Sequence, residues 1–244
     1  MRQAAEGANP TKTHRLIRDL RDSGKLVWNY TQNIDGLEHK VGLSTNPRKG
    51  QDDSPGVECV LLYGSLHRLR CSNCLGSFAW HEGVREMESL PDPEPPCPGC
   101  IKKSNDRTTR GKRATAIGRL RPDIVLYDEQ DPRAELISAI VQHDQSLRPD
   151  VLLIMGTSLA THGVQLLIRD FAKIIHRRRA GKVVFVNRTE PAKSWDSVID
   201  YWVGWDCDAW VEDLAERRPT LCGGKDGQDG RQVRDHSPEI DKPY

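Results

Sequence analysis

The segment VLLIMGTSLATHGVQLLIRDF, residues 151–171, predicts a short strand, a polar turn and an amphipathic helix. Its first five residues are all apolar, which is typical of a strand buried on both faces of a parallel sheet. After the turn, apolar side chains recur at helical spacing at Val164, Leu167, Ile168 and Phe171. A strand followed by a tight turn and a helix is the building unit of α/β folds, so this stretch indicates the fold class.

The same alternation continues on both sides of this unit. We expect strands at residues 26–30, 123–127, 183–186 and 201–203, and helices at 13–22, from residue 131 onward, and at 208–216. Together they predict a doubly wound parallel sheet of the Rossmann-like kind.

Polar loops follow three of the expected strands. They span residues 31–35, 156–158 and 187–189 and carry small or amide side chains. Ligands of doubly wound sheets bind at the carboxyl ends of the strands. Each loop alone can be an ordinary turn, but the three together favour a nucleotide site.

Four cysteines, Cys71, Cys74, Cys97 and Cys100, form two Cys-x-x-Cys pairs separated by 22 residues. Two such pairs can place four thiolates at the corners of a tetrahedron, which predicts a structural zinc site. Redox pairs or unpaired core cysteines are the alternative. The Pro98-Gly99 turn inside the second pair disfavours it. Four cysteine ligands leave no open coordination position, so this zinc is expected to hold structure and to do no chemistry.

Properties of the whole chain exclude several classes of function. The 244 residues carry a net charge of +1, which indicates no general affinity for nucleic acid. No apolar run exceeds five residues, against the roughly 20 that cross a membrane, and the polar start gives no secretory signal. The remaining three cysteines show no disulfide pattern, which fits a reducing compartment.

These patterns divide the chain into three parts. A Rossmann-like nucleotide-binding domain is expected from residues 10–62 and 119–216, interrupted by a zinc-binding module at 63–118 and followed by a disordered tail at 217–244. Within the module, residues 102–113 carry six Lys or Arg and predict a solvated, structureless loop. A weak localisation or nucleic-acid signal is the alternative for this stretch.

Several motifs resemble those of the sirtuins, the NAD-dependent protein deacylases, and particularly fungal nuclear members. The motifs follow in order over residues 10–216 and are YTQNIDGLEHKVGL (30–43), LYGSLHRLRCSNC (62–74), LRPDIVLYDE (120–129), MGTSLATHGV (155–164), VVFVNRT (183–189) and IDYWVGWDCDAWV (199–211). The resemblance implies NAD as co-substrate, structural zinc, an acetylated protein or histone peptide as substrate, and a nuclear location.

The resemblance also implies a role for each matching residue. The residues around nicotinamide and its ribose would be Gln32, Asn33 and Asp35. The residues on the adenosine side would be Gly156, Thr157, Ser158, Asn187 and the backbone of Cys207. The residues that flank an acyl-lysine peptide by strand addition would be Ile124, Val125, Gly163 and Val164.

Two features depart from the family pattern. Tyr63 stands where sirtuins have a catalytic histidine. Tyrosine has a pKa of about 10 against about 6.5 for histidine, so it is a poor base at neutral pH. His67, four residues on, is expected at the surface. The family's first strand and its Gly-Ala-Gly pyrophosphate loop have no match, which predicts unpaired edges on the neighbouring strands.

These departures predict a deacetylase that is inactive or crippled. The alternatives are a non-catalytic sirtuin-like binding protein or gene fragment and, more remotely, a zinc-ribbon protein that binds nucleic acid. Release of nicotinamide from NAD with an acetyl-lysine peptide distinguishes the first two hypotheses. Salt-dependent DNA binding at residues 102–113 would favour the third.

Overall fold

A computed structural model describes residues 2–45, 58–80, 94–126 and 129–222. The elements in chain order are α1 (Arg2–Gly7), α2 (Lys12–Asp22), β1 (Asn29–Thr31), α3 (Leu37–Lys40), β2 (Cys59–Leu61), β3 (Gly64–Cys71), β4 (Ser77–Ala79), α5 (Pro98–Thr109), β5 (Leu120–Ile124), α6 (Ala134–Ser146), β6 (Val151–Met155), α7 (His162–Ile175), β7 (Lys182–Val186), the 3-10 turn η1 (Lys193–Trp195), β8 (Tyr201–Val203), α8 (Cys207–Arg217) and α9 (Pro219–Cys222). None of the helices in these residues is long and apolar enough to cross a membrane.

The parallel strands form two sheets. Strands β6, β7 and β8 lie in that order, all parallel, with Val151 opposite Lys182 and Val184 opposite Tyr201. Strands β1 and β2 form a second parallel pair. Within the described residues no ladder joins β1 to β6: β1 pairs only with β2, and β6 pairs only with β7.

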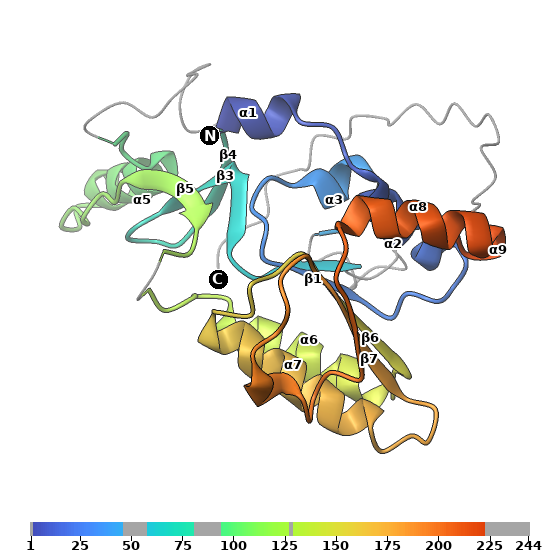
Figure 1. Cartoon of the computed structure of the whole chain (residues 1–244). Coiled ribbons are helices and arrows are strands. Elements are labelled where there is room, and N and C mark those ends of the chain that lie inside the picture. The colour runs from blue at the N-terminus through green and yellow to red at the C-terminus, as the bar shows by residue number, and fades with distance from the viewer. Residues whose placement is uncertain (1, 46–57, 81–93, 127–128, 223–244) are drawn as a thin grey trace.

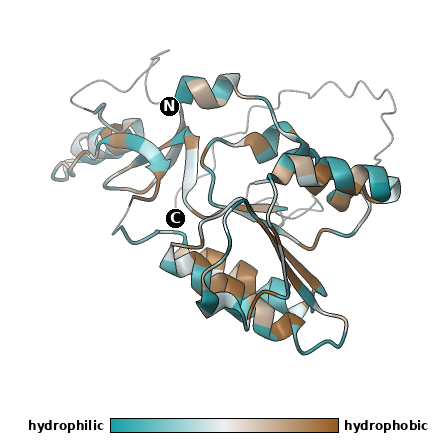
Figure 2. Ribbon diagram, in the orientation of Figure 1, coloured by the Kyte–Doolittle hydropathy of each residue, from teal (hydrophilic) through white to brown (hydrophobic). Residues whose placement is uncertain are grey.

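A shared apolar core holds the two parallel sheets together. Helix α7 buries Val164, Ile168, Phe171 and Ile175 against strand residues such as Phe185, and this periodicity is the one that predicted the helix. Tyr30 of β1 packs onto the same cluster, with its ring centroid 5.7 Å from that of Phe171. Figure 2 shows hydrophobic residues concentrated in β6, β7 and the helices beside them.

A third sheet carries the cysteine module. It is antiparallel, with the order β4-β3-β5, and it lies with α5 on one side of the molecule (Figure 1). The pairing of β3 with β5 is irregular between Ser65 and Leu69. In this sheet β3, which follows β2 in the chain, pairs with β5, which precedes α6.

Two expectations about polar segments are wrong. Residues 102–109 are not a loop, because they belong to the helix α5. Cys97 caps this helix by accepting a hydrogen bond from the Cys100 N–H, and Pro98 and Gly99 lie in its first turn. Beyond them, no glycine or proline follows before Gly111, whose φ is +69°. Residues 219–222 form α9 instead of disordered tail, whereas the tail beyond residue 222 lies outside the described residues.

Candidate functional site

The polar loops that follow β1 and β6 meet at one place. The Thr157 hydroxyl donates a hydrogen bond to Oε1 of Gln32 at 2.7 Å, which links the predicted adenosine side of the site to the predicted nicotinamide side. Gln32 directly follows β1 and Thr157 lies two residues beyond β6. The carboxyl ends of these two strands therefore converge, although no strand ladder joins them.

The loops after β7 and β8 lie at the same carboxyl edge of the parallel strands. The Gly156 N–H donates to the Val186 carbonyl at 3.1 Å, and the Asn187 N–H donates to the Val203 carbonyl at 3.1 Å. Gly156 has a φ of +61°, and a Cβ placed on it would lie 3.6 Å from Sγ of Cys207, at the start of α8. The structure thus brings together Gln32, Gly156, Thr157, Asn187 and Cys207, five of the residues to which the resemblance assigns a place around NAD.

The loop 31–36 has a defined local structure. The Thr31 hydroxyl accepts from the Asn33 N–H at 3.1 Å, and Oδ1 of Asp35 accepts from the Leu37 N–H at 3.2 Å. Gly36 caps the start of α3 with a φ of +71°, a conformation that favours glycine. Asp35 is half-buried and Asn33 is exposed, so the amide of Asn33 remains accessible to a ligand.

Tyr63 lies at the junction of β2 and β3. Its half-buried ring packs against the apolar cluster under the parallel strands, and its carbonyl accepts from the Val125 N–H at 3.0 Å. The hydrogen bond fixes the carboxyl end of β5 beside Tyr63. The next residue, Gly64, has a φ of +84° and abuts the main chain of Asp123.

The predicted peptide-binding residues lie on two elements. Ile124 ends β5, the last strand in the order β4-β3-β5, and Val125 follows it. Gly163 lies in the first turn of α7, and no atom lies within 4 Å of the position that a Cβ would take there, whereas Val164 is buried in the core. The side chain of Val164 therefore cannot face a peptide, and only its backbone could.

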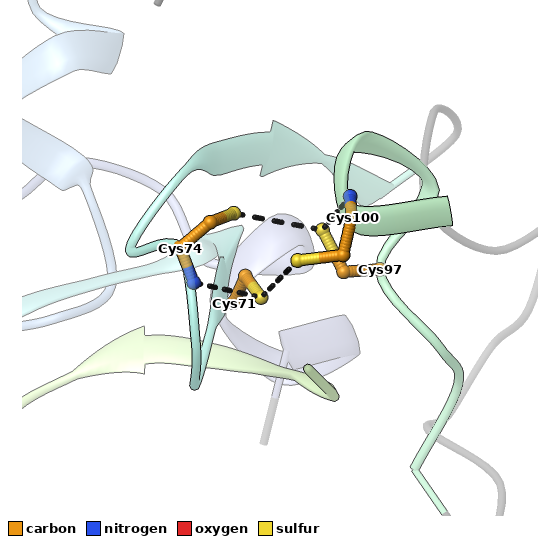
Figure 3. Close-up of side chains that lie close together, drawn as sticks. All are labelled: Cys71, Cys74, Cys97 and Cys100. Atoms are coloured by element: carbon orange, nitrogen blue, oxygen red, sulfur yellow. Dashed lines mark hydrogen bonds between the residues drawn. The ribbon is translucent and has the colours of Figure 1, made fainter. Parts of the chain in front are cut away.

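The four cysteines of the two Cys-x-x-Cys pairs form one cluster. Their Sγ atoms all lie within 4.8 Å of one another, with 3.7 Å between Cys71 and Cys100 and 3.8 Å between Cys74 and Cys97 (Figure 3). A tetrahedral zinc with Zn–S bonds of about 2.3 Å separates its sulfurs by about 3.8 Å, so the cluster fits zinc.

The backbone around the cluster favours a thiolate. Three N–H groups point at sulfur: those of Asn73 and Cys74 at Cys71, and that of Cys100 at Cys97, at 3.3–3.4 Å. Burial opposes ionisation of Cys100, but hydrogen bonds from the Gly118 backbone and the other thiols outweigh it and lower the pKa of this thiol to about 7. For Cys74 and Cys97 burial prevails and raises the pKa of the thiol, so the backbone donors favour one thiolate and not all four. Gly118 has no room for a side chain, because a Cβ would lie 2.5 Å from Sγ of Cys71.

His67 is not at the surface, contrary to the expectation from its spacing. It is half-buried, and its Nε2 lies 2.6 Å from the carbonyl oxygen of Asp35. Burial still alternates from Gly64 to His67, but the turn at Asp35 and Gly36 covers the outward side chain. The pairing of β3 with β5 is also irregular at this point. Pro122, on the partner strand, is the sequence signal that could have indicated the irregularity, because proline cannot donate a ladder hydrogen bond.

Comparison with known proteins gives a consistent result. The model of the Sir2 family matches residues 1–163. The chain is 41% identical over 224 residues to "NAD-dependent histone deacetylase HST3" of Candida albicans, covering 88% of this chain and 46% of that protein. It is 40% identical over 225 residues to the Saccharomyces cerevisiae protein of the same name, covering 87% and 49%. The chain therefore spans about half the length of these relatives.

A solved structure has the same fold. It is a Sir2 mutant with one histidine replaced by tyrosine, described with a p53 peptide and NAD. The TM-score is 0.60 at 22% sequence identity, and the alignment covers 88% of this chain and 73% of that chain.

Proposed function

Because this chain belongs to the Sir2 family, we propose that it is an NAD-dependent protein deacetylase of the sirtuin type whose chemistry is limited by Tyr63. The observation that carries the proposal is the convergence of the loops after β1, β6 and β7 with the start of α8, marked by the Thr157–Gln32 hydrogen bond. The names of the fungal relatives make acetylated histone the first substrate to test and the nucleus the expected location.

The residues at this edge fit the two ends of NAD. Gly156 has no side chain, so a ribose can approach the backbone between β6 and α8 closely. The hydroxyls of Thr157 and Ser158 can form hydrogen bonds with this ribose. On the other side, the amides of Gln32 and Asn33 can hold the carboxamide of nicotinamide, and Asp35 adds a carboxylate beside a cationic ring. NAD, when bound, supplies the ribose carbon that accepts the acyl group as nicotinamide leaves.

The edge of β5 is the proposed binding place of the acyl-lysine peptide. One side of β5 pairs with β3. On its other side the Leu120 N–H donates to the Pro95 carbonyl, and Pro96 forms a bridge to Arg119, but Ile124 has no ladder partner there within the described residues. An extended peptide can add to this free edge at Ile124 and Val125, with the backbone of Gly163 opposite. The Val125 N–H is already engaged by the Tyr63 carbonyl, so the position of Tyr63 and the peptide edge are coupled.

Tyr63 is the reason that we propose slow chemistry. A family histidine at this position would take a proton from a ribose hydroxyl, and loss of a positioned base costs about 10²- to 10⁴-fold in rate. The phenol ring of Tyr63 instead packs against the apolar cluster. The Sir2 mutant with a histidine-to-tyrosine change is described with both a p53 peptide and NAD, so we test binding and turnover separately in this chain.

Three versions of the chain test the proposal: the natural chain, Tyr63→His and Tyr63→Phe, with the phenylalanine as a control of nearly equal size. Calorimetry would measure the binding of NAD and of an acetyl-lysine histone peptide, and release of nicotinamide would measure turnover. We expect similar binding in all three, and turnover about 10²- to 10⁴-fold faster in Tyr63→His only.

Each measurement can contradict a different part of the proposal. Absence of NAD binding to all three proteins would refute the assigned cofactor site. Turnover that falls strongly in Tyr63→Phe would show that the tyrosine itself acts in the chemistry. Binding of both ligands without faster turnover in Tyr63→His would favour a non-catalytic binding protein.

A further inference from the structure

Strand β3 bulges in the middle of its pairing with β5. Ser65 lies opposite Asp123 and Leu69 lies opposite Pro122, so residues 66–68 stand opposite no residue of β5. Pro122 has no N–H and cannot complete a regular ladder here. The Ser65 hydroxyl instead accepts from the His67 N–H at 3.1 Å. Bulges of this kind redirect side chains and are common beside active sites.

The bulge presents two hydrogen-bond donors to the loop 31–36. The Leu66 N–H donates to the Ile34 carbonyl at 2.9 Å, and Nε2 of His67 lies 2.6 Å from the Asp35 carbonyl oxygen. A carbonyl oxygen can only accept, so the imidazole carries a proton on Nε2 and donates it. Trp80 supports the bulge from the end of β4, because its indole N–H donates to the Leu66 carbonyl at 2.8 Å.

The ring of His67 also packs against the turn that follows Asp35 and restricts its conformation. A Cβ on Gly36 would lie 2.8 Å from Cδ2 and 3.1 Å from Nε2 of His67, so the ring lies directly on the glycine backbone. Asp35 is thus held at two points: its carbonyl by His67, and its carboxylate by the Leu37 N–H at the start of α3. A change at His67 should therefore reorient the carboxylate of Asp35.

We propose that His67 is a positioning residue that holds Asp35, and with it the nicotinamide side of the site, in place from the β3 bulge. This inference rests on the proposed function for the assignment of the loop to nicotinamide. We assign His67 a role through Asp35, whose carbonyl its Nε2–H contacts, and not the role of the missing base.

Two substitutions and one control test the role. His67→Ala removes the donor, and His67→Gln keeps an N–H at a similar distance from the backbone. The control is His176→Ala, because Nε2 of His176 bonds a carboxylate oxygen of Asp200 at 2.9 Å at the other end of α7. Hydrogen exchange read by mass spectrometry would follow the amides of residues 33–37, and calorimetry would compare NAD with adenosine.

We expect amide exchange in residues 33–37 to become about 3- to 10-fold faster in His67→Ala. This factor corresponds to the free energy of one lost hydrogen bond. NAD should bind about 3- to 10-fold more weakly to this variant. Adenosine, which needs only the other half of the site, should bind unchanged. His67→Gln should recover most of both losses, and His176→Ala should show neither.

The possible results separate the two levels of inference. Unchanged exchange in His67→Ala would overturn the positioning role and leave the proposed function intact. Faster exchange with unchanged NAD affinity would overturn the link to nicotinamide, and with it the assignment of this loop in the proposed function. A His67→Gln protein that behaves like His67→Ala would show that the hydrogen bond is not what holds the loop.

Discussion

Gly64 is the position at which the structure makes its sharpest prediction about stability. Its φ is +84°, and a Cβ there would lie 2.0 Å from the carbonyl oxygen of Asp123 and 3.0 Å from Cα of Ile124. Both atoms belong to the main chain of β5, so no side-chain rotation can relieve the contact. Gly64→Ala must therefore separate β3 from β5 beside Tyr63.

The cost of this substitution has two parts. A left-handed conformation costs a residue with a Cβ about 1–2 kcal/mol. Separation of the strands also breaks the hydrogen bond from the Val125 N–H to the Tyr63 carbonyl, which contributes about 0.5–1.5 kcal/mol. Further β3–β5 pairs would be disturbed, so we expect Gly64→Ala to lower the free energy of unfolding by about 2–4 kcal/mol.

Gly24→Ala provides the matched control. Gly24 has a φ of +68°, and nothing lies within 4 Å of its Cβ position, so its substitution costs only the backbone strain. Urea unfolding followed by circular dichroism would give both values. With a slope of about 2–3 kcal/mol per molar urea, the midpoint of Gly64→Ala should fall by about 1 M and that of Gly24→Ala by less. Equal losses in the two variants would refute the predicted clash with β5.

Two further predictions concern the metal cluster and a buried acid. Cys97→Ser should abolish tight binding of one zinc per chain and lower the melting temperature, because metal binding and folding are coupled; full zinc content by elemental analysis would contradict this. Burial raises the pKa of Asp144, against hydrogen bonds from Tyr30 and His143. A raised folded-state pKa stabilises the protein below the unfolded pKa of about 4, and this contribution is lost as the pH rises toward the folded-state value. The free energy of unfolding of the natural chain minus that of Asp144→Asn should therefore fall from pH 4 to pH 7, and a difference independent of pH would exclude the effect.

Local patterns predicted most of the parallel framework. The apolar run at residues 151–155 became β6 without a change of bounds, and the helical spacing after it became α7. The strand predicted at 201–203 is β8. These elements were predictable because the pattern of apolar residues within each element decides which surface is buried. The two cysteine pairs were likewise sufficient to predict the four-sulfur cluster, because two Cys-x-x-Cys pairs at this spacing are typical of one metal site.

Features that depend on two distant segments could not be predicted in this way. The charge of the stretch at 102–113 predicted a loop without regular structure. The helix that begins after Cys97 instead continues through residue 109. The Thr157–Gln32 bond joins loops 125 residues apart in the sequence. His67 lies against the Asp35 carbonyl, 32 residues earlier in the chain, and no property of residues 64–71 alone reveals this contact.

Strand β3 runs from the proposed site to the cysteine cluster and so links the positions of the two. At its carboxyl end, Cys71 pairs with Leu120 beside the four sulfurs, and at its amino end, Gly64 pairs with Ile124 beside Tyr63. Between them, the bulge carries His67 to the loop of Asp35. The regular pairs with β5 at both ends and the Arg68–Ala79 pair with β4 hold the bulge in place, although residues 66–68 have no partner on β5. A structural metal that takes no part in chemistry can thus set the geometry at which the chemistry of this family would occur.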